Sequence, residues 1–247
     1  MMQVQAQSSA SDSSASYSHS STWFYAGIGG ALVTTAVLMH SDQRTYDGLR
    51  RFRQDHKIIR QTSPVITQLG DGFFTLGLFG GFAGYGWIGE DQKALRTAKI
   101  GVESFLFTGI TVQFIKHLAG RERPSVSTDA GGYWHGPYSP FQKSKKSVTL
   151  FDAFPSGHTT TVFSTATTIS DIYTQPWVSY TCYSLATVTA FTRVMERTHW
   201  LSDCFIGAII GHYGTKLVEH WNKDSNTVAI LPQIDEHQYG LLLAVKL

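Results

Sequence analysis

Long apolar stretches, separated by polar and charged turns, organise most of this chain. Five of them lie at 22–39, 64–88, 94–117, 174–193 and 199–220, and another starts at Ser156. Apolar stretches of this length, with few of the alternating patterns that mark strands, predict helices that pack against one another. We therefore expect an all-α fold, a helical bundle of about six core helices.

The two ends of the chain differ from this pattern. Residues 1–21 are Ser-rich and lack the apolar core of a signal peptide, so we expect a disordered leader. Residues 22–222 form the predicted helical domain. Within 223–247, the stretches 227–231 and 239–246 predict two short strands around Pro232, which form a C-terminal β-hairpin packed on the helices.

Composition leaves two kinds of helical protein open. Charged residues make up only 15% and aromatic residues 13%, which favours a membrane protein or a tightly packed helical one. The mean hydropathy of -0.09 is low for a chain with several membrane spans. Both six-span insertion and a compact body, soluble or membrane-associated, stay open. A net charge of +2 does not indicate a nucleic-acid partner.

The first group with possible chemistry lies at the end of the 94–117 stretch. Lys116 is followed seven residues later by Arg123, and Pro124 then turns the chain out of helical geometry. A lysine and a guanidinium at a helix exit can converge on one small dianion. Helix-dipole capping is the simpler alternative. His117 and Arg121 flank this group, and we expect both on the solvated surface.

The second group is Pro155-Ser156-Gly157-His158. Ser156 is a favourable N-cap, so a helix should begin directly after it. A helix N-terminus presents free backbone N–H groups to an anion, and Gly157 lets the backbone approach closely. His158 would stand at the rim of that anion site, although an ordinary helix cap explains the same residues.

The third group is Arg193, His199 and Asp203. His199 and Asp203 are four residues apart, so on one helix they share a face. Asp203 can then accept a hydrogen bond from one imidazole nitrogen and leave the other free to attack an electrophile. An ordinary contact on a helix surface is the alternative for this pair taken alone.

Together the three groups resemble the type 2 phosphatidic acid phosphatase superfamily, which also contains bacterial acid phosphatases and vanadium-dependent haloperoxidases. The resemblance covers about 105–215. It departs from the usual pattern only at Thr192, where a serine is common. It implies an active site at the ends of the third to sixth helices.

The resemblance also implies a role for each residue. His199 would attack phosphorus and form a phosphohistidine, Asp203 would orient His199, and His158 would protonate the leaving group and then activate water. The phosphate-binding residues would be Lys116, Arg123, Ser156, Gly157 and Arg193. Because cations and N–H groups can hold the phosphoryl oxygens, we expect no metal and no other cofactor.

The leaving group is not determined by these motifs. We expect a metal-independent phosphatase acting on phosphomonoesters or diphosphates, with a phosphorylated lipid as substrate. A soluble, non-specific acid phosphatase acting on small phosphate esters and a vanadate-dependent haloperoxidase are the alternatives, and a non-enzymatic envelope scaffold is a further one. Vanadate would inhibit the phosphatase or serve the haloperoxidase as cofactor. The resemblance implies a bacterial cell envelope location, membrane-associated or periplasmic, and the oligomeric state stays open.

Overall fold

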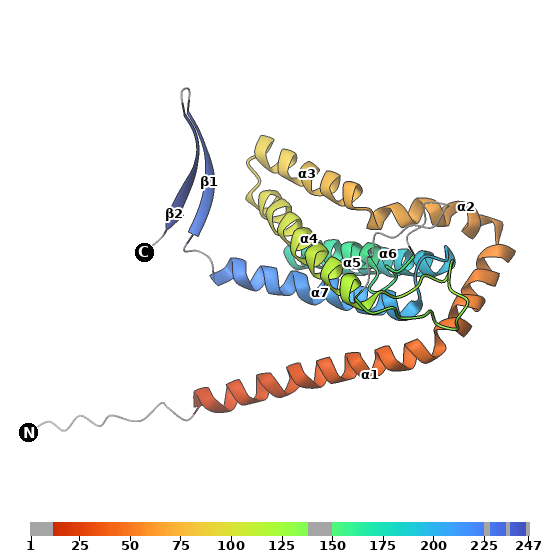
Figure 1. Ribbon diagram of the computed structural model, residues 1–247. Helices are drawn as coiled ribbons and strands as arrows, with labels where there is room; N and C mark the ends of the chain where they lie inside the picture. The colour runs from red at the N-terminus through yellow and green to blue at the C-terminus, as the bar shows by residue number, and fades with distance from the viewer. Residues whose placement is uncertain (1–11, 138–149, 225–227, 236–237, 246–247) are drawn as a thin grey trace, which may run out of the picture.

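The computed structural model describes residues 12–137, 150–224, 228–235 and 238–245. This part of the chain holds seven α-helices and one 3₁₀ helix (Figure 1). They are α1 (Asp12–Asp55), α2 (Lys57–Ile66), η1 (Thr67–Gly70), α3 (Gly72–Ile88), α4 (Gln92–Ala119), α5 (Gly157–Ile172), α6 (Pro176–Met195) and α7 (Leu201–Asp224). The expected helical bundle is therefore confirmed.

The centre of the bundle is α5, which packs against α4, α6 and α7. Its buried positions are mostly Ser, Thr and Ala rather than large apolar residues. Several of these hydroxyls donate to carbonyls one turn back, as Thr160 does to Ser156 and Thr168 to Ser164, both at 3.0 Å. Such bonds satisfy a buried hydroxyl within its own helix.

Glycines set the distance between α5 and α7. A Cβ atom added to Gly207 would lie 2.6 Å from the carbonyl oxygen of Ser156, and one added to Gly211 would lie 2.4 Å from that of Thr160. No side chain fits at these separations, so the two helices are in backbone contact. This contact fixes the first turn of α5 against α7.

Two helix predictions were wrong at their boundaries. The first helix was expected to end near 39, but α1 continues through the basic stretch to Asp55. Arg, Gln and Leu favour helix, and no proline interrupts that stretch. The 64–88 stretch is not one helix, because η1 separates α2 from α3 and Asp71 caps α3 by accepting from the N–H of Phe73 at 2.8 Å.

The strands β1 (Val228–Asp235) and β2 (Gln238–Val245) pair antiparallel beyond the end of α7, from Val228 opposite Val245 to Asp235 opposite Gln238. Only their backbone is described, so the predicted hairpin packed on the helices stays a prediction. Residues 1–11 of the expected leader lie outside the described residues, whereas α1 already begins at Asp12.

One helix in the described residues, α4, is long and apolar enough to cross a membrane. Its outer face carries exposed apolar side chains, among them Ile110 and Phe114. The loop after α4, the start of α5 and the start of α7 lie at the same end of the bundle (Figure 1). The three predicted groups are therefore on elements that meet at this end.

Candidate active site

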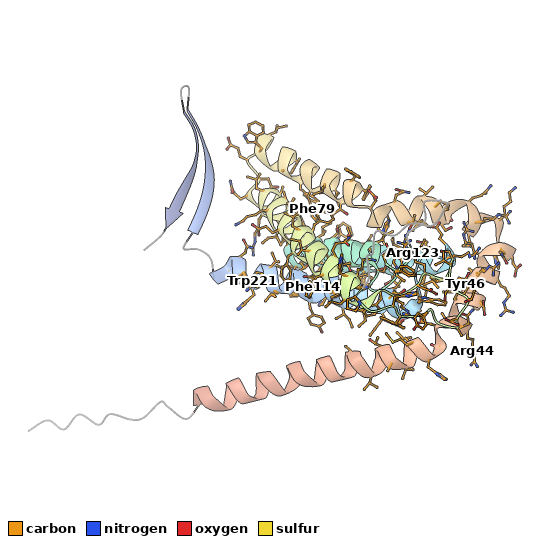
Figure 2. The ribbon with its side chains drawn as sticks, in the orientation of Figure 1. Arg44, Tyr46, Phe79, Phe114, Arg123 and Trp221 are labelled. Carbon is orange, nitrogen blue, oxygen red and sulfur yellow. The ribbon has the colours of Figure 1, made fainter. Side chains whose placement is uncertain are left out.

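All eight predicted site residues lie in the described part of the chain, around the junction of α4, α5, α6 and α7. Lys116 is buried in the last turn of α4, and Arg193 in the last turn of α6. Arg123 follows α4 in the loop, in the crowded region of side chains labelled in Figure 2. The remaining residues are Ser156, Gly157 and His158 at the start of α5, His199 just before α7, and Asp203 in its first turn.

The predicted helix start at Ser156 is confirmed. Ser156 caps α5, and its hydroxyl accepts from the N–H of Thr159 at 3.4 Å. The N–H of Ser156 donates in turn to the carbonyl oxygen of Asp203 at 3.0 Å. This bond joins the second group directly to the third, so the start of α5 is fixed beside the start of α7.

Asp152 holds two of the three cations, and Thr67 holds the third. Arg123 donates from Nε and Nη2 to the two carboxylate oxygens of Asp152, at 2.6 and 2.8 Å. Lys116 donates to the backbone carbonyl of Asp152. Arg193 donates from Nη1 to the hydroxyl of Thr67 at 2.7 Å, while its buried Nε has no hydrogen-bond partner among the described residues.

The geometry at His199 differs from the prediction. Its Nδ1 lies 3.9 Å from Oδ2 of Asp203, too far for a hydrogen bond, and 2.7 Å from the carbonyl oxygen of Ala153. A carbonyl only accepts, so Nδ1 carries the proton and Nε2 keeps its lone pair. The tautomer expected for a nucleophile is thus set by Ala153 and not by Asp203.

Asp203 lies beyond hydrogen-bond distance of His199, and each of its oxygens accepts from another group. Oδ1 accepts from Nη1 of Arg121 at 2.6 Å, and Oδ2 accepts from the N–H of Trp200 at 2.7 Å. Burial raises the pKa of Asp203, and the adjacent Arg121 guanidinium opposes that shift. Asp203 therefore fixes the turn that carries His199, through the backbone of Trp200.

Arg121 was expected on the surface, and that expectation was wrong. Its side chain is 1% exposed and reaches from the loop after α4 to α1 and α7. Besides Asp203, its guanidinium donates to Oδ2 of Asp42 and to the hydroxyl of Ser202, each at 2.7 Å. The rings of Trp134 and Trp200 lie against it, 4.8 and 5.5 Å from its central carbon.

Sequence reasoning missed Asp42, Arg121 and Asp152. Asp42 is 79 residues from Arg121 and lies where the apolar stretch of α1 gives way to polar and charged residues, so nothing in its local sequence marks it as buried. Asp152 lies three residues before Pro155 in a polar loop, and nothing in its local sequence distinguishes it from a solvated acid.

Positive charge dominates the environment of both histidines. Burial and the charges of Arg193, Arg123 and Lys116 together lower the pKa of His158 to about 4, against the opposite effect of Asp71. Burial also lowers the pKa of His199 well below its ordinary value, with the same three cations acting in the same direction. Both imidazoles are therefore neutral near pH 7, inside a cluster of cations that can attract a dianion.

A metal is not required to explain these side chains. Among the described residues, no group of three or more His, Cys, Asp or Glu side chains is placed to hold a metal ion. The cations and the free N–H groups at the start of α5 can bind a phosphate-sized anion between two neutral imidazoles. The expected absence of a cofactor stays a prediction.

The chain matches the PAP2 superfamily over residues 99–227, just over half of its length, and it belongs to this superfamily of phosphatases. A lipid A 1-phosphatase of Porphyromonas gingivalis is 37% identical over 78 residues, which are 31% of this chain and 17% of that protein. One from Rhizobium etli is 27% identical over 164 residues, 62% of this chain and 67% of that protein.

Two solved structures share the fold. LpxE of Aquifex aeolicus superposes with a TM-score of 0.55 at 17% identity, covering 72% of this chain and 94% of that one. A transmembrane phosphatidylglycerolphosphate phosphatase of the same type from Bacillus subtilis gives 0.53 at 15% identity, covering 80% and 96%. At these identities the likeness concerns the fold alone.

Proposed function

We propose that this chain is a metal-independent lipid-phosphate phosphatase in which His199 is the nucleophile. The observation that carries the proposal is the bond from Nδ1 of His199 to the Ala153 carbonyl, which leaves the lone pair of Nε2 available. Burial, together with the neighbouring cations, lowers the pKa of His199 and keeps its imidazole neutral, and the cations also favour the approach of a phosphate dianion.

In the first step, Nε2 of His199 forms a bond to phosphorus while the bond from phosphorus to the leaving oxygen breaks. The phosphoryl oxygens are held by Lys116, Arg123, Arg193, Ser156 and the N–H of Gly157. These groups offset the charge on the equatorial oxygens that Mg²⁺ offsets in many phosphotransferases. Asp203 acts as a positioning residue, because it holds the turn that carries His199.

His158 would supply the proton that the leaving oxygen takes up. Its pKa of about 4 is too low for an acid at neutral pH, but two negative charges on a bound phosphoryl group oppose the cations that lower it. In the second step, His158 accepts a proton from water as the water oxygen attacks phosphorus. The nitrogen–phosphorus bond then breaks, and phosphate leaves.

Two observations support a lipid as the carrier of the phosphate. The curated relatives are named lipid A 1-phosphatases, and one fold neighbour is a phosphatidylglycerolphosphate phosphatase. On α4, Ile110 and Phe114 are 71% and 65% exposed, and Phe114 is two residues from Lys116 (Figure 2). Exposed apolar side chains on the helix that also carries Lys116 suit acyl chains attached to a phosphorylated headgroup.

We place the phosphatase domain at 22–222 and a separate C-terminal extension at 223–247. We place the protein at the bacterial cell envelope, in contact with a membrane, since its proposed substrate is a membrane lipid.

Phosphate release from lipid A in detergent micelles and from an aryl phosphate tests the proposal. Both activities should persist in EDTA and stop with vanadate, and labelled phosphate on the trapped protein should survive alkali but not acid. Loss of activity in EDTA would contradict the metal-free mechanism. Turnover of the aryl phosphate but not of lipid phosphates would favour the soluble acid phosphatase, and bromide oxidation by peroxide after vanadate loading would favour the haloperoxidase.

A further inference from the structure

The end of α1 and the whole of α2 carry the strongest local charge in the protein. Residues 44–60 contain six Lys and Arg residues and two Asp residues, a net charge of +4, whereas the entire chain has +2. The cations are Arg44, Arg50, Arg51, Arg53, Lys57 and Arg60. None of the eight site residues lies in this segment, so its charge has no part in the proposed chemistry.

The short helix α2 is apolar on two sides at once. Ile59 and Ile66 are half-buried on the side that also carries the buried Ser63, and α2 packs there against α6 and the end of α1. Ile58 and Val65, two turns apart on the outer face, are 72% and 70% exposed. The apolar surface of α2 thus continues beyond the protein core into solvent.

Cations border this outer apolar face. Lys57 and Arg60 are exposed on α2, where Arg60 donates to the carbonyl oxygen of Gln54 at 3.3 Å. Arg51 is exposed on the preceding turn of α1, where Phe52 is also exposed. An exposed apolar strip edged by Lys and Arg is typical of a helix that lies in the interface of a bilayer with anionic headgroups. A purely electrostatic partner would leave Ile58 and Val65 without a role.

We propose that this surface, made of Arg51, Lys57, Ile58, Arg60 and Val65, docks on an anionic lipid surface. We name it the α2 docking face. The proposal deepens the proposed function, since it assumes that the substrate is presented by a lipid surface and states which part of the protein contacts that surface.

The α2 docking face is one turn from the cation cluster. Thr67, the first residue after α2, accepts the hydrogen bond from Arg193. Gly70, at the end of η1, lies so close to the backbone of His158 that an added Cβ would be 2.7 Å from its carbonyl oxygen. A lipid surface that holds α2 would therefore also fix the distance from that surface to Arg193 and His158.

The first experiment reads docking without turnover. Cys182 is replaced by Ser, Ile58 by Cys, and an environment-sensitive fluorophore is attached at position 58 of the full chain. Phosphatidylglycerol micelles should shift its emission to the blue, and phosphatidylcholine micelles should shift it much less. An equal shift with both lipids, or with heparin added to neutral micelles, would overturn the proposal.

The second experiment reads the effect on the reaction. Phosphatidylglycerol in the micelle should lower the KM for lipid A about five-fold in the native protein. The triple variant Arg51→Gln, Lys57→Gln and Arg60→Gln should lose that effect. A matched control, Lys93→Gln, Arg96→Gln and Lys99→Gln, removes the same charge from exposed positions at the far end of α4 and should keep it.

Turnover of an aryl phosphate distinguishes a failure of the docking proposal from a failure of the proposed function. It should be the same in the native protein, the triple variant and the control, because none of these residues contacts the site. If the native protein fails to hydrolyse either substrate, the proposed function is wrong, and the fluorophore still decides the docking. If phosphatidylglycerol lowers the KM equally in the triple variant, the docking proposal is wrong.

Discussion

Ion pairs at the two ends of the helical bundle differ in how far they are exposed to solvent. At the end that holds Arg123, the guanidinium of Arg121 pairs with Asp42 and Asp203, and all three side chains are at most 1% exposed. At the other end, where Trp221 packs edge-on against Phe107, Lys216 pairs with Asp171 while 44% and 26% of their side chains stay exposed (Figure 2).

This difference separates charge that positions residues from charge that solvates the surface. Burying an ion pair removes both ions from water, and it is tolerated only when nearly every donor and acceptor is satisfied. Arg121 meets that condition through Asp42, Ser202 and Asp203. An exposed pair such as Lys216 and Asp171 contributes little, because water screens it. Substitutions at the two ends should therefore differ strongly in effect.

The largest effect is expected at the nucleophile. His199→Asn should lower kcat for an aryl phosphate by at least about 10,000-fold, because the variant lacks the Nε2 lone pair that would attack phosphorus. His220→Asn at the far end is the matched control and should keep full activity. Steady-state kinetics measure both, and near-normal turnover by His199→Asn would refute the assignment.

The second effect is expected at Arg121. Arg121→Leu leaves two buried carboxylates without their cation and should lower the free energy of unfolding by about 3–5 kcal/mol. Arg121→Lys keeps the charge but loses the planar guanidinium that bonds to both carboxylates, so we expect smaller losses of stability and of kcat than for Arg121→Leu. Thermal unfolding and aryl phosphate kinetics on both variants distinguish them, and equal losses would show that the guanidinium geometry is irrelevant.

A third effect depends on the leaving group. His158→Ala should reduce turnover of an alkyl phosphate about 1,000-fold but that of a p-nitrophenyl phosphate only about 10-fold, since a nitrophenolate leaves without a proton. The ratio of the two kcat values is the measurement. Equal losses on both substrates would indicate that His158 only binds the phosphoryl group and does not protonate the leaving oxygen.

The smallest effect is expected at the far end. Burial, and then the hydrogen bond with Asp171, raise the pKa of Glu219 to about 7. An acid with a raised pKa in the folded state destabilises the fold as pH rises from about 4.5 through 7. Glu219→Gln should therefore raise Tm by about 2 °C at pH 8 and leave it unchanged at pH 4. A gain at both pH values would point to packing instead.

Sequence patterns predicted the parts of this structure that depend on neighbouring residues. The Ser156 cap and the long apolar helices follow from local signals, whereas the grouping of their ends was implied by the family resemblance. Hydrogen bonds between distant segments could not be predicted in this way, because local patterns do not show that Asp42 and Arg121 come together in the fold. For the same reason Asp203 was predicted to accept a hydrogen bond from His199. In the structure His199 bonds to the Ala153 carbonyl, and Asp203 accepts from the N–H of Trp200.

The break between α2 and α3 shows a second limit. Apolar residues continue through 64–88, and only the short η1 turn and the Asp71 cap divide the segment. The turn exists because Thr67 and Gly70 meet Arg193 and His158, which are contacts with distant parts of the chain. Tertiary contacts and the local Asp71 cap together divide a stretch that its apolar content predicted as one helix.

Because α5 and α7 are in backbone contact, a single added methyl group would change the distance between His158 and His199. At Gly207 and Gly211, no side chain of α7 separates its backbone from that of α5. A Cβ added at either glycine would push the start of α5 away from α7. Two positions that take no part in the chemistry therefore help to fix the distance between the starts of the two helices that carry the site.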